Sequence, residues 1–492
     1  MRYLGFDLGA SSGKMMEGYL DGAKLHTEII HRFPNRHVEM AGGLYWNIIN
    51  IYENLIVGII KACSNKSESS FSLGIDSFCN DFGLIDCNGK LISQVYCYRD
   101  LRTERTEKNI YDKVSKKELY IRTGSQIAPF NTSMEMASMV IENQKMYLDC
   151  CDKALMMPDL LVYFLTGEKN IEYTLASVTQ LLDFRTDKWC TEIMKKLGIR
   201  EDIFPDIVST GSYVGKVRKN IVPEVAEKDI SVVAVTEHDS AAAVVAIPTQ
   251  KERVGFISSG TWSIVGTEVR KPILNEDTFR HNIAFEGGID HRYRMIKNVM
   301  GLWILQECKI DVMKKTGRDY SFEELNEEAY KAAPMKYMID PDDPLFYMPG
   351  NMNEKIKEYC RKTGQGDIPS FGAIIRTVLE SLALKYRWVY DKMEGVLGYS
   401  LEQIHIVGGG GQNAMLNQFV ANACNKPVFA GPFESALIGN IVEQMIASGE
   451  IASLARGREI IQDSFEIKEY EPQEKALWNE HYKRFEKLLG RR

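Results

Sequence analysis

Three glycine-rich segments of the chain, residues 9–14, 258–261 and 408–411, have the composition of phosphate-binding loops. Glycine lets backbone N–H groups approach an anion, and successive amides in a turn form a concave anion site. The first segment also supplies serine hydroxyls and the ammonium group of Lys14. It is one residue short of a Walker A loop and continues into Met15 where that loop has Ser or Thr. We therefore predict a tight turn between two strands, which either binds phosphate or is a plain hairpin.

A candidate general base lies at Asp239. It follows an apolar strand pattern at residues 231–235 and precedes three alanines, so we expect it between a strand end and a helix start. An aspartate at such a place commonly caps the helix. An ionised carboxylate near a domain boundary can instead accept the proton of a substrate hydroxyl during phosphoryl transfer. His238 beside it either supports the fold or orients a hydroxyl-rich substrate.

Length and composition limit the kinds of protein that this chain can be. Its 492 residues exceed the roughly 250 to 300 residues at which single cores stop growing, so we predict two domains, 1–247 and 248–492. Sixty Lys and Arg residues against 67 Asp and Glu give a net charge of −7, which disfavours a nucleic-acid partner. We expect small-molecule ligands instead. The sequence does not indicate an oligomeric state.

The amino terminus and the apolar runs indicate a cytoplasmic protein without a membrane partner. Asp7 stands where a secretory signal needs apolar residues, and the longest apolar run, 241–248, is far shorter than the roughly 20 residues that span a bilayer. The ten cysteines are scattered without the spacing of a zinc site, so we predict reduced thiols, mostly in cores.

The elements that must position these residues follow a plan that occurs twice. Strand patterns at residues 3–8, 15–20 and 24–33 form one hairpin series, and those at 253–258 and 263–269 repeat it with the same Gly-Phe pair before the turn. Helical patterns lie between further strand patterns, which is typical of α/β layers. The main ones are residues 45–63, 134–147 and 370–397, and the tail has one apolar face formed by Trp478, Tyr482, Phe485 and Leu489. We infer an internal duplication.

Six motifs occur in order along the chain: D-L-G-A-S-S-G-K at 7–14, G-I-D-S at 74–77, H-D-S at 238–240, S-S-G-T-W-S at 258–263, K-N-V-M-G-L-W-I-L-Q at 297–306 and H-I-V-G-G-G at 405–410. Taken together, these motifs resemble the FGGY family of carbohydrate kinases, over nearly the whole chain. The segment at residues 297–306 points to the branch of the family that acts on L-rhamnulose.

This resemblance implies an α/β fold with two ribonuclease-H-like domains of the actin-like ATPase type, flanking a hinged cleft. It implies transfer of the γ-phosphate of ATP to the 1-hydroxyl of L-rhamnulose, with Mg²⁺ as cofactor. L-fuculose or another ketose is the close alternative substrate. An alternative of another class is a catalytically silent sugar sensor, which would have no need of the base that Asp239 would provide.

The resemblance also implies roles for individual residues by their position in the motifs. Asp239 would be the general base, and Asp7 would hold the metal or its waters. Sugar would contact Cys79, His238, Asp239, Ser240 and Asn298. Nucleotide would contact the first loop and three later positions: Ala10, Ser11, Ser12, Gly13, Lys14, Thr261, Gln306 and Gly409.

One segment departs from the family's pattern. Where kinases of this branch usually have Trp-Gly-Val, this sequence has Phe78, Cys79 and Asn80. A cysteine takes volume that a glycine leaves open, so the identity of the sugar is less firmly implied than kinase activity.

Overall fold

The computed structural model describes residues 1–64 and 66–490, and this part of the chain divides into two compact units. Each unit is assembled from more than one stretch of chain. Unit 1 comprises Met1–Gln250, Val269–Met295 and Glu434–Ser464, and unit 2 comprises Lys251–Glu268, Ile296–Phe433 and Phe465–Arg492.

Unit 1 contains a large sheet, several two-stranded sheets and helices. Its strands are β1 (Arg2–Leu8), β2 (Ser12–Asp21), β3 (Lys24–Pro34), β4 (His37–Met40), β5 (Gly43–Trp46), β6 (Ser70–Ser77), β7 (Phe82–Ile85), β8 (Lys153–Met156), β9 (Ile171–Glu172), β10 (Leu182–Asp183), β11 (Lys188–Trp189), β12 (Ile207–Val208), β13 (Ser212–Lys216), β14 (Asp229–Ala234) and β17 (Ala284–Gly287). Its helices are α1 (Ile48–Cys63), α2 (Arg102–Tyr111), α3 (Lys116–Thr123), α4 (Thr132–Ile141), α5 (Lys145–Cys150), α6 (Met157–Thr166), α7 (Tyr173–Val178), α8 (Thr191–Leu197), α9 (Asp239–Val245), α10 (Glu276–Arg280), α16 (Ser435–Ala447) and α17 (Leu454–Ser464), with short 3₁₀ turns η1 (Pro223–Val225) and η2 (Ile289–His291).

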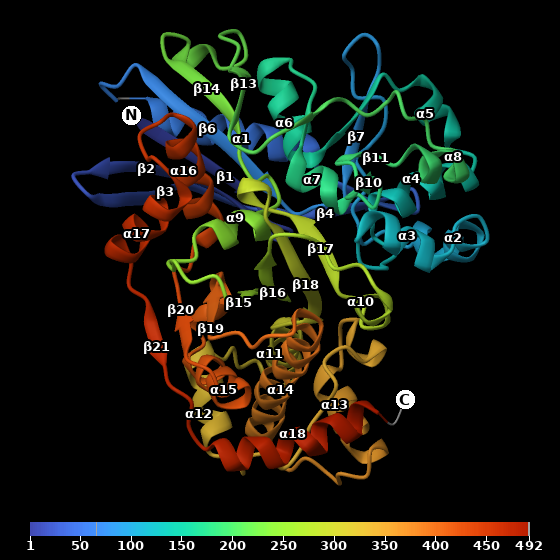
Figure 1. Ribbon diagram of the computed structural model, residues 1–492, viewed down its shortest axis with the longest axis vertical. Coiled ribbons are helices and arrows are strands. Elements are labelled where there is room, and N and C mark those ends of the chain that lie inside the picture. The colour runs from blue at the N-terminus through green and yellow to red at the C-terminus, as the bar shows by residue number, and fades with distance from the viewer. Residues whose placement is uncertain (65, 491–492) are drawn as a thin grey trace. The chain divides into compact units, whose positions relative to one another are not determined.

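The large sheet of unit 1 has the strand order β13-β14-β6-β1-β2-β3 (Figure 1). Its three central strands, β14, β6 and β1, run parallel to one another. The carboxyl ends of parallel strands meet at one edge of a sheet, which is where α/β proteins bind ligands. Asp7 lies near the carboxyl end of β1, and the chain continues from the ends of β6 and β14 into the segments that carry Cys79 and Asp239.

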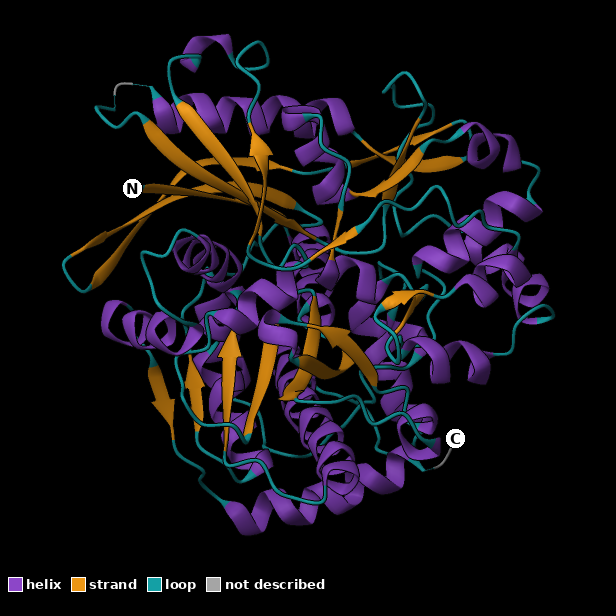
Figure 2. Cartoon of the chain, turned by 45° about the horizontal axis from the view of Figure 1, so that its top comes forward, coloured by secondary structure: helices purple, strands orange, loops and turns teal. Residues whose placement is uncertain are grey.

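Helices cover both faces of this sheet (Figure 2). Helix α1 packs against β1, β2 and β3, and α16 packs against β1 and β6. Side chains alternate between the faces of a strand, so Phe6 joins the core beneath α1 while Gly5 faces α16. A Cβ atom at Gly5 would lie 3.3 Å from Leu437 Cδ2 of α16. Asp7 is two residues from Gly5 on the same strand, so its side chain points to the face of the sheet that α16 covers.

Unit 2 is built around the strands β18 (Tyr293–Met300), β16 (Trp262–Val269), β15 (Val254–Ser259), β19 (Gln403–Val407), β20 (Val428–Ala430) and β21 (Lys468–Tyr470), in that spatial order. Strands β15, β19 and β20 are parallel. The helices are α11 (Trp303–Thr316), α12 (Phe322–Tyr330), α13 (Met352–Lys362), α14 (Phe371–Leu397), α15 (Ala414–Cys424) and α18 (Lys475–Leu489), with 3₁₀ turns η3 (Pro344–Phe346) and η4 (Gly409–Gln412).

Helix α14 is the central helix of unit 2 and packs directly on β15. The Tyr390 hydroxyl donates to the carbonyl oxygen of Phe256 at 2.8 Å, and a Cβ atom at Gly255 would lie 2.8 Å from the Tyr390 ring. The Gly-Phe pairs of the two hairpins therefore have one physical explanation, because each glycine lies where a helix crosses its strand.

Most of the predicted elements are present, with local differences. The hairpin strands, the long helix at 371–397 and the tail helix are confirmed. The predicted helix at 134–147 is interrupted after Ile141, where Asn143 has a φ of 60°. Tyr45 and Trp46 belong to β5 rather than to the helix that follows, and Ser12, Gly13 and Lys14 belong to β2 rather than to the turn.

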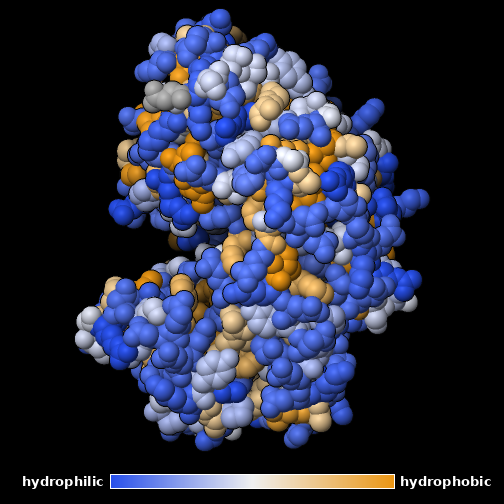
Figure 3. All heavy atoms as spheres, turned by 90° about the vertical axis from the view of Figure 1, so that its left-hand side faces the viewer, coloured by the Kyte–Doolittle hydropathy of each residue, from blue (hydrophilic) through white to orange (hydrophobic). Residues whose placement is uncertain are grey.

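The described helices include none that is both long and apolar enough to cross a membrane. The face drawn in Figure 3 is mostly hydrophilic, with apolar residues in separate patches. Seven of the ten cysteines are buried and all ten are free thiols, as predicted.

Candidate active site

A row of charged side chains crosses the edge of the sheet in unit 1. In the strand register Asp7 lies opposite Lys14 of β2 on one side and opposite Asp76 of β6 on the other. Asp76 is fully buried, and its Oδ2 accepts a hydrogen bond from Asn440 Nδ2 at 2.6 Å. Burial and the neighbouring Asp7 carboxyl raise the pKa of Asp76. Burial and the nearby Asp239 carboxyl likewise raise the pKa of Asp7 to about 7, while Lys14 lowers it.

The first glycine-rich turn is anchored through its carbonyl groups. The N–H of Gly9 donates to the carbonyl of Ser12 at 3.0 Å. Asn35 donates from its side chain to Gly9 O at 2.9 Å and from its backbone to Ser11 O at 3.0 Å. Ala10, between these anchors, packs against the core of unit 1. The turn is thus a fixed platform beside Asp7.

Lys14 forms an ion pair that the sequence did not reveal. Its Nζ donates to Glu434 Oε2 at 2.6 Å, and the Arg32 guanidinium contacts the other oxygen of the same carboxylate at 3.3 Å. Glu434 directly precedes α16, far from Lys14 in the sequence. An anion that binds at the turn therefore has to compete with Glu434 for the Lys14 ammonium.

Asp239 is the first residue of α9, and His238 is the N-cap. No side chain caps this helix, so the structure does not support the helix-cap interpretation of Asp239. The Asp239 side chain is 34% exposed, which leaves it accessible to a ligand. Its surroundings raise the pKa of Asp239 through burial, and His238, the Ser240 N–H and Arg294 partly offset this effect.

Arg294 organises the residues beside Asp239. It donates from Nη1 to Ser240 Oγ at 2.8 Å, from Nη2 to Glu286 Oε2 at 2.8 Å, and from Nε to the carbonyl of Gly287 at 3.1 Å. Nη2 also contacts His238 Nδ1 at 3.1 Å. A guanidinium can only donate, so His238 Nδ1 accepts and Nε2 carries the proton that it donates to Ser240 Oγ at 2.9 Å. Burial alone would raise the pKa of Glu286, but the Arg294 guanidinium holds it below its usual value.

Cys79 faces this same group of residues. Burial raises the pKa of its thiol, and the nearby carboxyls of Glu286 and Asp239 raise it further. The left-handed backbone of this loop falls on Asn80, whose φ is 79°, so position 79 does not require glycine for its conformation. Phe78 stacks on Trp46 with ring centroids 4.5 Å apart. The Cys79 thiol therefore lies near the carboxyl groups of Asp239 and Glu286.

The other predicted residues belong to unit 2. The carbonyl of Thr261 accepts the N–H groups of Gly301 at 3.1 Å and Trp303 at 3.2 Å, which ties the second turn to the start of α11. Gln306 lies one turn into that helix. Asn298 lies on β18, and its Oδ1 has no hydrogen-bond partner among the described residues.

The four consecutive glycines of unit 2, residues 408–411, differ in how much space surrounds each one. A Cβ atom at Gly410 would overlap Ser259 Oγ, and one at Gly408, where φ is 82°, would lie 3.0 Å from the Ser259 carbonyl oxygen. These two glycines allow close packing of η4 on the end of β15. A Cβ atom at Gly409 would meet no atom within 4 Å, so the backbone is open to a ligand at this position.

Comparisons with known proteins agree with these features. The sequence profiles of the FGGY family of carbohydrate kinases match the chain twice, the N-terminal domain at residues 2–246 and the C-terminal domain at residues 255–448. The chain belongs to this family. The predicted carbohydrate kinase is thereby confirmed, and for such a kinase the family implies ATP as phosphoryl donor.

Individual relatives match over nearly their whole length. A protein of Bacteroides thetaiotaomicron named rhamnulokinase is 37% identical over 487 residues, covering 99% of both chains. A rhamnulokinase of Bacillus subtilis is 35% identical over 474 residues, covering 96% of each.

Solved structures show the fold. A ligand-bound xylulose kinase from Lactobacillus acidophilus superposes with a TM-score of 0.79 at 16% identity, covering 99% of this chain and 97% of that one. Plasmodium falciparum glycerol kinase with ADP superposes with a TM-score of 0.77 at 17% identity, covering 100% of this chain and 98% of that one. The two-domain α/β fold, consistent with the actin-like ATPase type, is confirmed.

Three residues of the site were missing from the sequence-based prediction. Asp76 stands inside the G-I-D-S motif, where a carboxylate in an apolar strand is itself a signal, since a buried charge needs a partner. The same argument could have found Arg294, which is 1% exposed in an apolar strand. Nothing local marks Glu434, because its partner Lys14 is distant in the sequence.

Proposed function

We propose that the protein is an ATP-dependent rhamnulokinase, which transfers the γ-phosphate of ATP to the 1-hydroxyl of L-rhamnulose and gives L-rhamnulose 1-phosphate and ADP. The observation that carries this proposal is the similarity over nearly the whole length to proteins named rhamnulokinase. Its partners are thus a ketose and ATP. Because ATP is a cytoplasmic metabolite, we place the enzyme in the cytoplasm.

Asp239 is the general base of the proposed reaction. Its carboxylate is accessible, does not cap α9, and lies beside His238 and Ser240, which suit a hydroxyl-rich substrate. Ser240 Oγ accepts from both Arg294 and His238, so its own proton is available to a sugar oxygen. Removal of the proton from the attacking hydroxyl as the phosphorus–oxygen bond forms needs a base within hydrogen-bond reach of the sugar.

The carboxylates of unit 1 suit a magnesium ion. The Asp239 carboxyl raises the pKa of Asp7, and both Asp7 and Asp239 raise the pKa of Asp76. Asp76 Oδ1 is buried without a hydrogen-bond partner among the described residues. The described residues contain no group of three or more ligands that could hold a metal alone. This fits Mg²⁺, which commonly binds one or two carboxylates and takes its remaining ligands from water and phosphate. Asp7 would hold the ion or its waters, and the ion would neutralise phosphate charge.

The phosphates of ATP are assigned to two turns. The first turn supplies Ala10, Ser11, Ser12 and Gly13 with Lys14, and the second supplies Thr261. The rest of the nucleotide is assigned to Gln306 and to Gly409, whose open position supports this role. Positioning and charge neutralisation are what phosphoryl transfer chiefly requires.

The sugar contacts Cys79, His238, Asp239, Ser240 and Asn298 in this proposal. A ketose other than L-rhamnulose, such as L-fuculose, is the alternative that Cys79 favours, because the thiol faces Asp239 where the usual pattern of this branch has a glycine. A silent sensor is disfavoured, since it would need neither the base nor the charged row of Asp7, Lys14 and Asp76.

An ADP-release assay over a panel of ketoses tests the proposal. With L-rhamnulose, L-fuculose, L-xylulose and L-ribulose at matched concentrations, we expect the highest kcat/KM for L-rhamnulose and a strict requirement for Mg²⁺. Phosphorus NMR should place the new phosphate on the 1-hydroxyl. A higher kcat/KM for another ketose would replace L-rhamnulose as substrate, and ADP release with none of them would contradict the assigned substrate class.

A further inference from the structure

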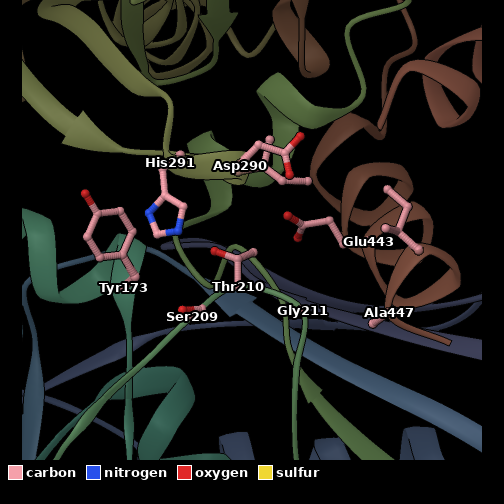
Figure 4. Close-up of a pocket in the computed structure, with 11 residues that line it drawn as sticks. Tyr173, Ser209, Thr210, Gly211, Asp290, His291, Glu443 and Ala447 are labelled. Carbon is pink, nitrogen blue, oxygen red and sulfur yellow. The ribbon is translucent and has the colours of Figure 1, made fainter. Parts of the chain in front are cut away.

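A second pocket in unit 1 adjoins the segment that leads to Asp239. It has a volume of about 300 Å³, near the lower limit of small-molecule sites. Thr210, Asp290, His291 and Glu443 line it (Figure 4), and none of the residues assigned above to sugar, nucleotide or metal does so. The pocket is therefore separate from the proposed active site.

Glu443 is the residue of this pocket whose side chain has an unsatisfied hydrogen-bond acceptor. Its side chain is 2% exposed and comes from α16. Oε2 accepts two hydrogen bonds from Thr236, from N at 2.6 Å and from Oγ1 at 2.8 Å. Oε1 is buried and has no hydrogen-bond partner among the described residues. Figure 4 shows the carboxyl pointing into the space that Asp290 and Thr210 also face. A buried acceptor without a donor is costly unless a ligand supplies one.

The ionisable side chains of this pocket are the carboxyls of Asp290 and Glu443 and the imidazole of His291. Asp290 is exposed at its rim, and neither lysine nor arginine is among the described residues that line it. Burial and the carboxyls of Glu172 and Asp290 raise the pKa of Glu443 to about 8. Thr210 donates its hydroxyl proton to Glu172 Oε1 at 2.9 Å, so it presents lone pairs to the pocket. The exposed Asp290 carboxylate, the unpaired Glu443 Oε1 and the lone pairs of Thr210 favour a positively charged donor, whose binding would draw the proton from Glu443.

Other residues of the lining are apolar. Ile289, Ile446 and Ala447 contribute aliphatic surface, and Tyr173 contributes an aromatic ring to which a cation is attracted. A bare metal ion would make no use of this apolar part of the lining. An aliphatic stem that carries an ammonium group matches both parts of the lining.

We propose that this pocket binds a small organic cation, namely a protonated primary amine on a short aliphatic stem, with the ammonium donating to Glu443 Oε1 and to Asp290. The site is carried by α16 and by the η2 turn, where Asp290 and His291 have φ values of 55° and 52° and hold a tight left-handed conformation. Because Glu443 also holds Thr236, three residues before Asp239, the occupied pocket is in direct contact with the segment that positions the proposed base.

Calorimetry on the full chain tests this proposal without depending on kinase activity. The probe is 1,4-diaminobutane, and the matched control ligand is 1,4-butanediol, which has nearly the same length and no charge. In 0.15 M salt we expect the diamine to bind at least about tenfold more tightly than the diol, since hydrogen bonds to charged groups are the stronger ones. Asp290→Asn and Glu443→Gln should each weaken diamine binding about tenfold.

Glu28→Gln is the matched control variant, because it removes one carboxylate from an exposed strand position of unit 1 and changes the net charge equally. The Kd of this variant for the diamine should stay within twofold of that of the unaltered protein. If Glu443→Gln does not fold, Asp290→Asn at the exposed rim decides alone. The proposal is overturned if the diol binds as tightly as the diamine, if 10 mM diamine gives no binding, or if Asp290→Asn behaves like Glu28→Gln.

Discussion

The two glycine-containing turns follow strands of similar sequence but are held in different ways. The turn after β1 lies beside Asp7 and the Lys14–Glu434 ion pair, in a row of charged side chains. The turn after β15 is held by backbone hydrogen bonds, in which Gly260 and Thr261 accept from the first residues of α11. One strand–turn–strand pattern therefore produces a charged site in unit 1 and a neutral backbone platform in unit 2.

The difference between the two turns suggests that the reacting groups belong to unit 1 and that the nucleotide contacts of unit 2 are mostly uncharged. Charged groups that can move a proton or hold a cation gather at the sheet edge of unit 1. In unit 2 the candidate ligand contacts are Thr261, Gln306 and the open backbone at Gly409. We expect substitutions in unit 1 to change turnover and sugar choice, and substitutions in unit 2 to change nucleotide binding.

The largest effect is expected for Asp239→Asn. Asparagine has nearly the same shape but cannot accept the hydroxyl proton, so turnover should fall by roughly 10²- to 10⁴-fold. ATP binding by calorimetry should remain nearly unchanged. Asp463→Asn, at an exposed position of α17, is the control and should keep normal turnover. Sugar-dependent ADP release by Asp239→Asn within threefold of the unaltered protein would remove Asp239 from this role.

Cys79→Gly should change which ketose is preferred. Restoring the small residue opens volume beside Asp239 and Glu286, and one small group in a pocket alters discrimination by about 10- to 200-fold. We expect the ratio of kcat/KM between L-rhamnulose and its best competitor to shift at least about tenfold, with little change in the KM for ATP. Cys87→Ser, at an exposed thiol, serves as control. An unchanged ranking across the ketose panel would show that Cys79 is only an ordinary partly buried thiol.

Two neighbouring glycines of unit 2 test the backbone platform. Gly410→Ala places a methyl group against Ser259 and should lower the free energy of unfolding by about 1 to 3 kcal/mol, as overpacking does. Gly409→Ala has room and should leave thermal stability unchanged while raising the KM for ATP. Thermal denaturation and steady-state kinetics on both variants measure this contrast. An equal loss of thermal stability in the two variants, or an unchanged KM for ATP in Gly409→Ala, would count against Gly409 as a nucleotide contact.

The smallest effect is expected at the ion pair of the first turn. Glu434→Gln removes the carboxylate that competes with phosphate for Lys14, so the Kd for ATP should fall about threefold, in keeping with the modest strength of a partly exposed pair. Lys14→Met should raise the Kd for ATP, because it removes the ammonium group that would bind phosphate. Weaker ATP binding by Glu434→Gln would mean that Glu434 positions Lys14 for phosphate instead of competing with it.

Local patterns were sufficient for much of the fold. Short apolar runs on either side of turn residues placed the hairpins around Gly9 and Gly260, and a long apolar pattern placed the helix at 371–397 to within a residue of its start. Where a boundary was wrong, the local signal was ambiguous. Tyr45 and Trp46 suit a strand or a helix equally, and pairing with β4 decides for the strand.

By itself the sequence determined the α/β class, the family and the motif residues Asp7, Lys14, Cys79 and Asp239, because strand periodicity and turn composition are properties of short segments. Only the tertiary structure decided their partners. Arg294 binds His238, Ser240 and Glu286, and Glu434 binds Lys14 across 420 positions. Such contacts join residues on strands to residues at the starts of α9 and α16, and no local pattern records which charge will lie beside which.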